Sequence, residues 1–98
     1  MKRVVVRPAA AADIEDAYQW YESQQPGLGE DFLVALNAIR DRIVEHPEAF
    51  PILHRNTRRA LIPRRFPYGI LYRIHEDMII VVACIHAKRD PRRWQRRT

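Results

Sequence analysis

Basic side chains at the ends and polar faces of the last three predicted strands are the residues of this chain best suited to chemistry. They are Arg58, Arg59, Arg65, Arg73, His86, Lys88 and Arg89. Cationic groups that gather on one surface attract phosphate or carboxylate groups, and neighbouring strands of a sheet lie less than about 5 Å apart. We therefore expect several of these side chains to share one concave face that a polyanionic partner occupies.

A second interpretation is that these lysine and arginine side chains only protect exposed strand edges. The charge distribution favours a binding face, because an inert surface normally mixes both signs. Residues 55–97 hold twelve of the seventeen Lys and Arg residues and three acidic residues, whereas residues 1–50 hold five basic and nine acidic ones. These two parts carry about −4 and +9, which together give the net charge of +5.

RNA cleavage is one reaction that such a face could support. It needs a base to take the 2′-hydroxyl proton, an acid for the leaving oxygen, and cations that stabilise the phosphate. His86 closes the predicted central strand and is the best candidate for proton transfer. A histidine at the end of a strand is more often structural, so both roles stay open for His86.

Two tryptophans pose a similar question. Trp94 lies in the basic tail, about residues 88–98, beside Arg92 and Arg93. Its indole could stack on a base or anchor a partner, with cation–π support from arginine, or it could tuck the C-terminus against the sheet. For Trp20 we favour simple packing, while an exposed Trp20 would mark a docking surface.

The remaining composition indicates a cytoplasmic protein without a metal or cofactor. Cys84 is the single cysteine and lies in an apolar run, which favours a buried, reduced thiol. The apolar run at residues 4–6 is stopped by Arg7, too early for a signal peptide, and no segment is long enough to span a bilayer. The histidines are not clustered as metal ligands usually are. We expect no membrane partner.

Hydrophobic spacing predicts the elements that must position these residues. They are a strand (3–7), a helix (about 9–24), a second helix that ends near His46, a loop (47–56) and three strands (57–62, 66–74 and 79–85). A chain of 98 residues fits a single domain, residues 1–98. The expected fold is α+β with the order β-α-α-β-β-β, a helical hairpin packed on a small, mainly antiparallel sheet.

Several segments, taken in order, resemble the RelE/ParE family of bacterial toxins. They are Arg7-Pro8-Ala9, Asp13-Ile14, Trp20-Tyr21, Pro26-Gly27-Leu28-Gly29, His46-Pro47, Phe66-Pro67-Tyr68 with Tyr72, and His86-Ala87-Lys88-Arg89-Asp90-Pro91 with Trp94. The resemblance covers nearly the whole chain. It implies a RelE/ParE-like fold and a toxin of a type II toxin–antitoxin module, silenced when its cognate antitoxin binds across it.

The family divides into RelE-like toxins, which cut messenger RNA on the ribosome, and ParE-like toxins, which poison DNA gyrase. RelE-like members use an arginine in the middle of the penultimate strand, another after the last strand, and usually a tyrosine near the C-terminus. Here Gly69 stands at the first of these positions and Trp94 near the third, while Arg89 matches the second. These departures favour a ParE-like toxin. In the alternative, a ribosome-dependent mRNA endoribonuclease, His86, Arg73 and Arg89 would be the catalytic residues.

The resemblance also implies an antitoxin whose acidic, partly disordered segment folds on the basic face and in a groove beside the hairpin. The residues expected to bind the antitoxin or the target are Arg58, Arg59, Arg65, Arg73, Lys88, Arg89, Arg92, Arg93 and Trp94. The expected partners are the antitoxin, in a hetero-oligomer, and DNA gyrase, or the ribosome and mRNA in the alternative. A hypothesis of another class is a non-toxic, basic nucleic-acid-binding module, although the chain lacks exposed aromatics interleaved along a strand of the RNA-recognition type.

Overall fold

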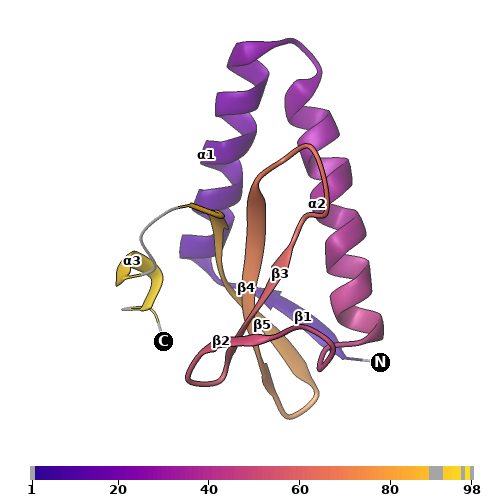
Figure 1. Ribbon diagram of the computed structural model, residues 1–98, viewed down its shortest axis with the longest axis vertical. Coiled ribbons are helices and arrows are strands. Elements are labelled where there is room, and N and C mark those ends of the chain that lie inside the picture. The colour runs from indigo at the N-terminus through magenta and orange to yellow at the C-terminus, as the bar shows by residue number, and fades with distance from the viewer. Residues whose placement is uncertain (1, 89–91, 96, 98) are drawn as a thin grey trace.

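The computed structural model, which describes residues 2–88, 92–95 and 97, is a helical hairpin on a mainly antiparallel sheet (Figure 1). The elements in chain order are β1 (Arg3–Val6), α1 (Pro8–Gln24), α2 (Leu28–Glu45), β2 (Ile52–His54), β3 (Thr57–Leu61), β4 (Tyr68–His75), β5 (Met78–His86) and α3 (Arg92–Gln95). The α+β fold expected from the sequence is confirmed. Two short elements, β2 and α3, add to the predicted order.

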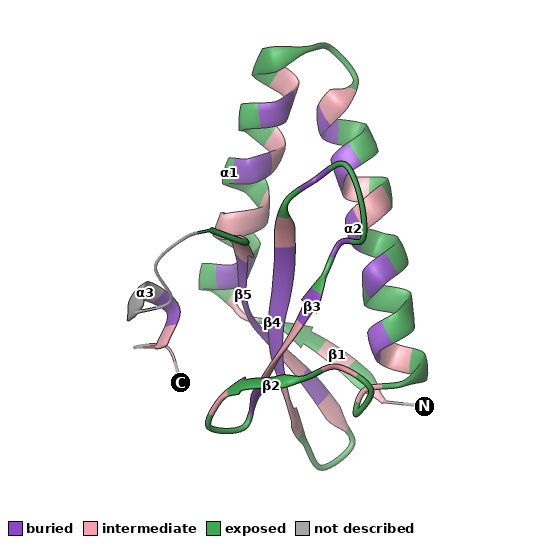
Figure 2. Cartoon of the chain, viewed as in Figure 1, coloured by how far each residue is buried: buried purple, intermediate pink, exposed green. Residues whose placement is uncertain are grey.

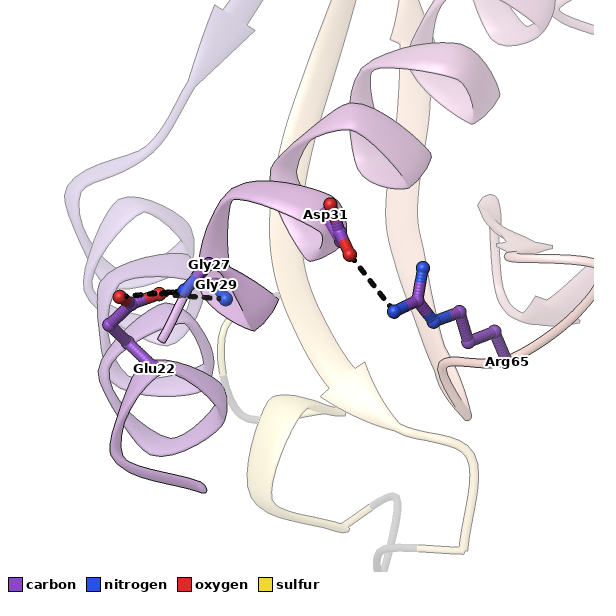
Figure 3. A network of polar contacts seen from close by, with 5 residues as sticks. All are labelled: Glu22, Gly27, Gly29, Asp31 and Arg65. Carbon is purple, nitrogen blue, oxygen red and sulfur yellow. Dashed lines mark hydrogen bonds and ion pairs between the residues drawn. The ribbon is translucent and has the colours of Figure 1, made fainter. Parts of the chain in front are cut away.

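A carboxylate and two glycines build the turn between α1 and α2 (Figure 3). Glu22 accepts hydrogen bonds from the backbone N–H groups of Gly27 and Gly29, both at 3.0 Å. These bonds satisfy N–H groups that the first turn of a helix leaves unpaired. Gly27 has a φ of 89°, which favours glycine, and a Cβ on Gly29 would lie 2.8 Å from Cε2 of Tyr18. Gly27 therefore suits the backbone conformation of the turn, and Gly29 allows the close approach of the two helices.

The sheet has the strand order β1-β5-β4-β3-β2. β1 runs parallel to β5, and the other pairs are antiparallel. β5 lies between β1 and β4, as expected for its unbroken apolar sequence. The prediction of a loop over residues 47–56 was wrong in part, because Ile52–His54 forms an edge strand against β3. With exposed Ile52 and Leu53, this strand has no alternation of buried and exposed residues that could have revealed it.

The main core lies between the hairpin and the sheet (Figure 2). Phe32 of α2 is fully buried, and its ring lies 5.2 Å from Tyr21 of α1 and 5.4 Å from Tyr68 of β4, measured between centroids. Tyr72 is fully buried on the same face of β4, and its hydroxyl donates a hydrogen bond to the carbonyl of Pro47. Burial raises the pKa of Tyr72 to about 12. The hairpin therefore rests on a continuous layer of aromatic and aliphatic side chains.

A smaller core lies on the opposite face of the sheet, because alternate strand residues point to opposite sides. Leu71 and Ala83 contribute to it from β4 and β5, and Trp94 of α3 covers them. Trp94 is 1% exposed, so it tucks the C-terminal segment against the sheet, the second of the two interpretations of this residue.

The cysteine environment agrees with the sequence, since Cys84 is buried. Burial, and secondarily the charge of Asp13, raise the pKa of its thiol to about 12, so the reactive thiolate is scarce at neutral pH. Within the described ranges, no helix combines the length and apolar content that crossing a membrane requires. Among the same residues, no group of three or more His, Cys, Asp or Glu is placed to hold a metal ion.

Candidate partner-binding surface

Arg58 acts as an internal brace. Its Nη1 atom donates hydrogen bonds to the backbone carbonyls of Glu48, at 3.1 Å, and Phe50, at 2.7 Å. Arg58 lies opposite Tyr72 in the β3–β4 register, which places its side chain on the hairpin side of the sheet. The guanidinium group that the sequence suggested as a partner contact is thus already used to hold the segment between α2 and β2.

Arg65 is an exposed cation in the loop between β3 and β4. Its Nη2 atom lies 2.9 Å from Oδ2 of Asp31 on α2 (Figure 3), and both side chains are more than half exposed. Its guanidinium also lies 5.1 Å from the centroid of the Phe66 ring. An exposed ion pair of this kind contributes only up to about 1 kcal/mol. A partner carboxylate can therefore replace Asp31 at little cost.

Arg59 and Arg73 lie on the face of the sheet opposite the hairpin. Arg59 is paired with Leu71 in the β3–β4 register, and Arg73 follows Leu71 at the next position of the same side of β4. The Nε atom of Arg73 is buried and makes no hydrogen bond within the described structure. The two arginines thus flank the small core that Trp94 covers, on the other side of the sheet from Arg58. The expected single concave face is divided between two sides of the sheet.

His86 is the last residue of β5. Its Nδ1 atom accepts a hydrogen bond from the backbone N–H of Lys88 at 3.1 Å, and its ring packs edge-on against Tyr68, 5.4 Å between centroids. His86 pairs with Tyr68 in the β4–β5 register, whereas Arg73 lies five residues farther along β4, about 17 Å at roughly 3.4 Å per residue. The structure does not bring His86 and Arg73 together.

The structure describes the side chains of only some of the C-terminal cations. Lys88 is exposed just after β5. Arg89 and the side chains of Arg92 and Arg93, all expected to bind a partner, lie outside the described residues.

A cleft of about 750 Å³ runs between α1 and the end of β5. The residues that line it are Asp13, Asp16, Ala17, Trp20, Tyr21, Arg65, Pro67, Tyr68, Cys84, Ile85, His86, Trp94 and Arg97. Trp20 is 56% exposed, so the expectation that it is packed away was wrong. Tyr21 belongs to the apolar stripe of α1 and is buried. Trp20 lies about 100° round the helix from Tyr21, so its indole faces the cleft. The cleft therefore presents both aromatic and charged walls.

An ion pair that sequence reasoning missed closes one part of this cleft. Asp13 of α1 accepts two hydrogen bonds from the guanidinium of Arg97, at 2.7 and 3.2 Å. The side chains of Asp13 and Arg97 are 20% and 30% exposed, and the hydrogen bonds that Arg97 donates to Asp13 raise the pKa of Arg97 further. Arg7 in turn donates to the carbonyl of Arg97 at 3.1 Å. The end of the chain is thereby tied to the start of α1.

A second cavity, of about 220 Å³, lies between the hairpin, β1 and the sheet. Its walls are mostly apolar and come from β1, α2 and the sheet, with Val6, Leu33 and Ile79 among them. Val6 is also 43% exposed. This cavity is smaller and is lined by fewer charged groups than the cleft beside β5. We therefore assign the candidate partner site to the cleft beside β5.

Comparison with known proteins places this architecture in a family. Residues 4–91 match the model for the family described as the ParE toxin of the type II toxin–antitoxin system parDE. A solved structure described as the chromosomal ParDE TA system from P. aeruginosa has a TM-score of 0.67 and 18% sequence identity, covering 90% of this chain and 98% of that chain. No curated protein sequence matches this chain significantly. The structural likeness establishes the fold, and the family match extends over most of the sequence. The chain therefore belongs to the family of ParE toxins of type II toxin–antitoxin systems.

Proposed function

We propose that this chain arrests growth by binding and poisoning DNA gyrase, and that a cognate antitoxin neutralises it by covering its basic surfaces. The match of residues 4–91 to the ParE family carries this proposal. Gyrase and the reduced state of the buried Cys84 both fit a cytoplasmic protein.

The geometry supports a binding function over RNA hydrolysis. Proton transfer and phosphate stabilisation must act on the same few atoms, yet His86 and Arg73 lie at distant positions of the β4–β5 ladder. Trp94 is buried and carries no group that exchanges a proton at neutral pH.

The surroundings of Gly69 add to the sequence argument against the nuclease. This is the position where RelE-like toxins are expected to carry a strand arginine. A Cβ here would lie 2.8 Å from Cδ2 of Leu61 and 3.2 Å from the carbonyl of Ala60. A larger side chain here would require the Leu61 side chain to turn away and the neighbouring strand β3 to give by a few tenths of an ångström.

The exposed cations suit an acidic antitoxin. Of the expected binding residues that are charged and whose side chains the structure describes, Arg65 and Lys88 are exposed, and Arg58, Arg59 and Arg73 are half-buried. They lie in the part of the chain that carries the excess positive charge, and charge complementarity speeds association with an acidic segment.

The proposal is tested by inducing the chain alone and together with its candidate antitoxin, which is to be sought as a short acidic reading frame next to the gene. The chain alone should stop growth and produce gyrase-linked DNA breaks while messenger RNA stays intact, and the second protein should restore growth. Ribosome-dependent cleavage of messenger RNA in the arrested cells would instead support the nuclease alternative. Normal growth with the folded chain present would support the non-toxic nucleic-acid-binding module.

A further inference from the structure

The outer edge of β5 is covered along only half of its length. β1 pairs with residues 78–81 of β5, and the strand then continues to His86. Residues 82–86 have β4 on one side, and the described part of the chain supplies no strand on the other. Backbone groups on such an edge are a template for a further strand.

Side chains occupy the hydrogen-bonding positions of this edge. The backbone N–H of Cys84 donates to Oδ2 of Asp13 at 3.0 Å, and the carbonyl of Val82 accepts a hydrogen bond from Arg97 at 3.2 Å. Both backbone groups therefore point away from β4 and toward α1. Because alternate residues of a strand point their backbone groups the same way, His86 is directed to this edge as well.

The Asp13–Arg97 pair thus takes the place of a neighbouring strand. One carboxylate supplies the acceptor and one guanidinium supplies the donor that a peptide backbone would offer. The pair is held by two side-chain hydrogen bonds that join residues far apart in the sequence. Side chains that cap an edge in this way prevent uncontrolled pairing with other chains.

The cleft beside this edge has the shape and chemistry for an extended peptide. Its volume is about 750 Å³, and it follows β5 past Cys84 to His86, where Trp20 and Tyr68 form an aromatic wall. An added strand along residues 82–86 would span about 16 Å. The exposed indole of Trp20 offers an apolar contact to one of its side chains.

We propose that an extended segment of the antitoxin adds to β5 at residues 82–86 and displaces the Asp13–Arg97 pair from the strand edge. A carbonyl of the added segment accepts from the Cys84 N–H, and one of its N–H groups donates to the Val82 carbonyl. Main-chain hydrogen bonds then give affinity, while alternate side chains enter the cleft. This inference rests on the proposed function, because it assumes an antitoxin partner.

The charges around the cleft predict the polarity of the segment. Asp13 and Asp16 line the α1 wall, whereas Arg65 and Arg97 lie elsewhere around the cleft. Arg97 loses its partner Asp13 when the added strand displaces the ion pair from the edge. Arg65 is paired only with the exposed side chain of Asp31. Acidic residues of the segment are therefore expected next to the two arginines, and uncharged residues along α1.

The test uses the purified full-length toxin and overlapping synthetic peptides that cover the antitoxin found to restore growth. The tightest peptide is then resynthesised with single backbone N-methyl groups. Strand addition predicts that methylation weakens binding roughly tenfold at alternate positions, the effect of about one lost backbone hydrogen bond, and much less between them.

Two toxin variants supply a matched control. Asp13→Asn and Asp16→Asn each remove one negative charge from the same wall, but only Asp13 holds the edge of β5. Asp13→Asn should tighten peptide binding several-fold more than Asp16→Asn, because the added strand no longer competes with the full ion pair. Thermal unfolding of both variants verifies that the fold is intact.

The outcomes separate this inference from the proposed function. If the antitoxin forms a complex and restores growth but no peptide binds, or if methylation shows no alternation, strand addition at β5 is wrong while neutralisation stands. If Asp13→Asn and Asp16→Asn changed the peptide affinity equally, strand addition would also be contradicted. The effect of Asp13 would then come from its charge alone and not from its contact with the edge of β5. If the antitoxin neither binds nor restores growth, the proposed function itself is refuted.

Discussion

The two faces of the sheet are covered by cores of very different size. The face toward the hairpin is covered by α1 and α2 and contains a continuous core with Phe32, Ile39 and Tyr72. The opposite face has a small cluster around Leu71 and Trp94, covered by the short helix α3. Stability is thus concentrated on one side, and the other side can change its covering at lower cost. A protein that must accept a partner gains from such a division.

Truncation of the hairpin core should have the largest effect. Phe32→Ala removes a fully buried ring that packs on Tyr21, Phe66 and Tyr68. The free energy of unfolding should fall by about 3–5 kcal/mol, as for other buried phenylalanines. Urea unfolding followed by circular dichroism measures this loss. A loss below about 1 kcal/mol would show that the hairpin face is not the main store of stability.

Alkaline pH should weaken the same face. The pKa values of Tyr72 and Cys84, both in the hairpin core, are raised to about 12 from 10.0 and 9.0 in an unfolded chain. A raised pKa means that the unfolded state loses its proton first, so the stability is complete below about pH 9 and falls as the pH rises toward 12. Each group contributes a slope of about 1.4 kcal/mol per pH unit within its own window.

Urea unfolding at about pH 8 and about pH 11 measures this slope. Tyr72→Phe and Cys84→Ala should each remove part of it. A pH dependence that is the same in both variants and in the original chain would contradict the assignment.

Removal of the cover on the opposite face should cost less. Trp94→Ala deletes a residue that is 1% exposed, but α3 can detach without opening the hairpin core. We expect a loss of about 2 kcal/mol, below that for Phe32→Ala. Far-ultraviolet circular dichroism should remain that of the folded chain. If Trp94→Ala unfolds the whole chain, the two faces are not independent.

Two neighbouring arginines provide a smaller and sharper comparison. Arg58→Ala breaks two hydrogen bonds to backbone carbonyls on the hairpin side and should lower the stability by about 1–2 kcal/mol. Arg59→Ala, on the opposite face, should change it by less than about 0.5 kcal/mol. In a binding assay with the antitoxin the order should reverse, with Arg59→Ala the more harmful. Equal stabilities of the two variants would contradict the assignment of Arg58 to internal hydrogen bonds and of Arg59 to partner binding.

The hairpin was predictable from the sequence because its signals are local. The glycines near the turn and the spacing of apolar residues at three and four positions fixed both helices to within a residue or two. The strict alternation over residues 66–74 likewise located β4. In contrast, β2 shows no alternation of buried and exposed residues. Trp94 is a single apolar residue in an arginine-rich tail, so no repeating pattern indicates whether it is buried or exposed.

The candidate site depends on distant pairings that no local pattern records. Asp13 is an acid near the N-terminal end of α1 and Arg97 is one of several tail arginines, yet they form one ion pair. The division of Arg58 from Arg59 and Arg73 follows from the strand register, which the spacing of charges alone does not give. Exposure of Trp20 depends on how far the hairpin covers the sheet.

Inhibition of purified gyrase by the purified chain tests the central claim most directly. The account predicts that the chain blocks supercoiling of a relaxed plasmid and traps cleaved DNA, that the antitoxin abolishes both effects, and that His86→Ala leaves them intact. Unchanged gyrase activity at saturating chain, with cleavage of ribosome-bound messenger RNA that His86→Ala abolishes, would contradict it.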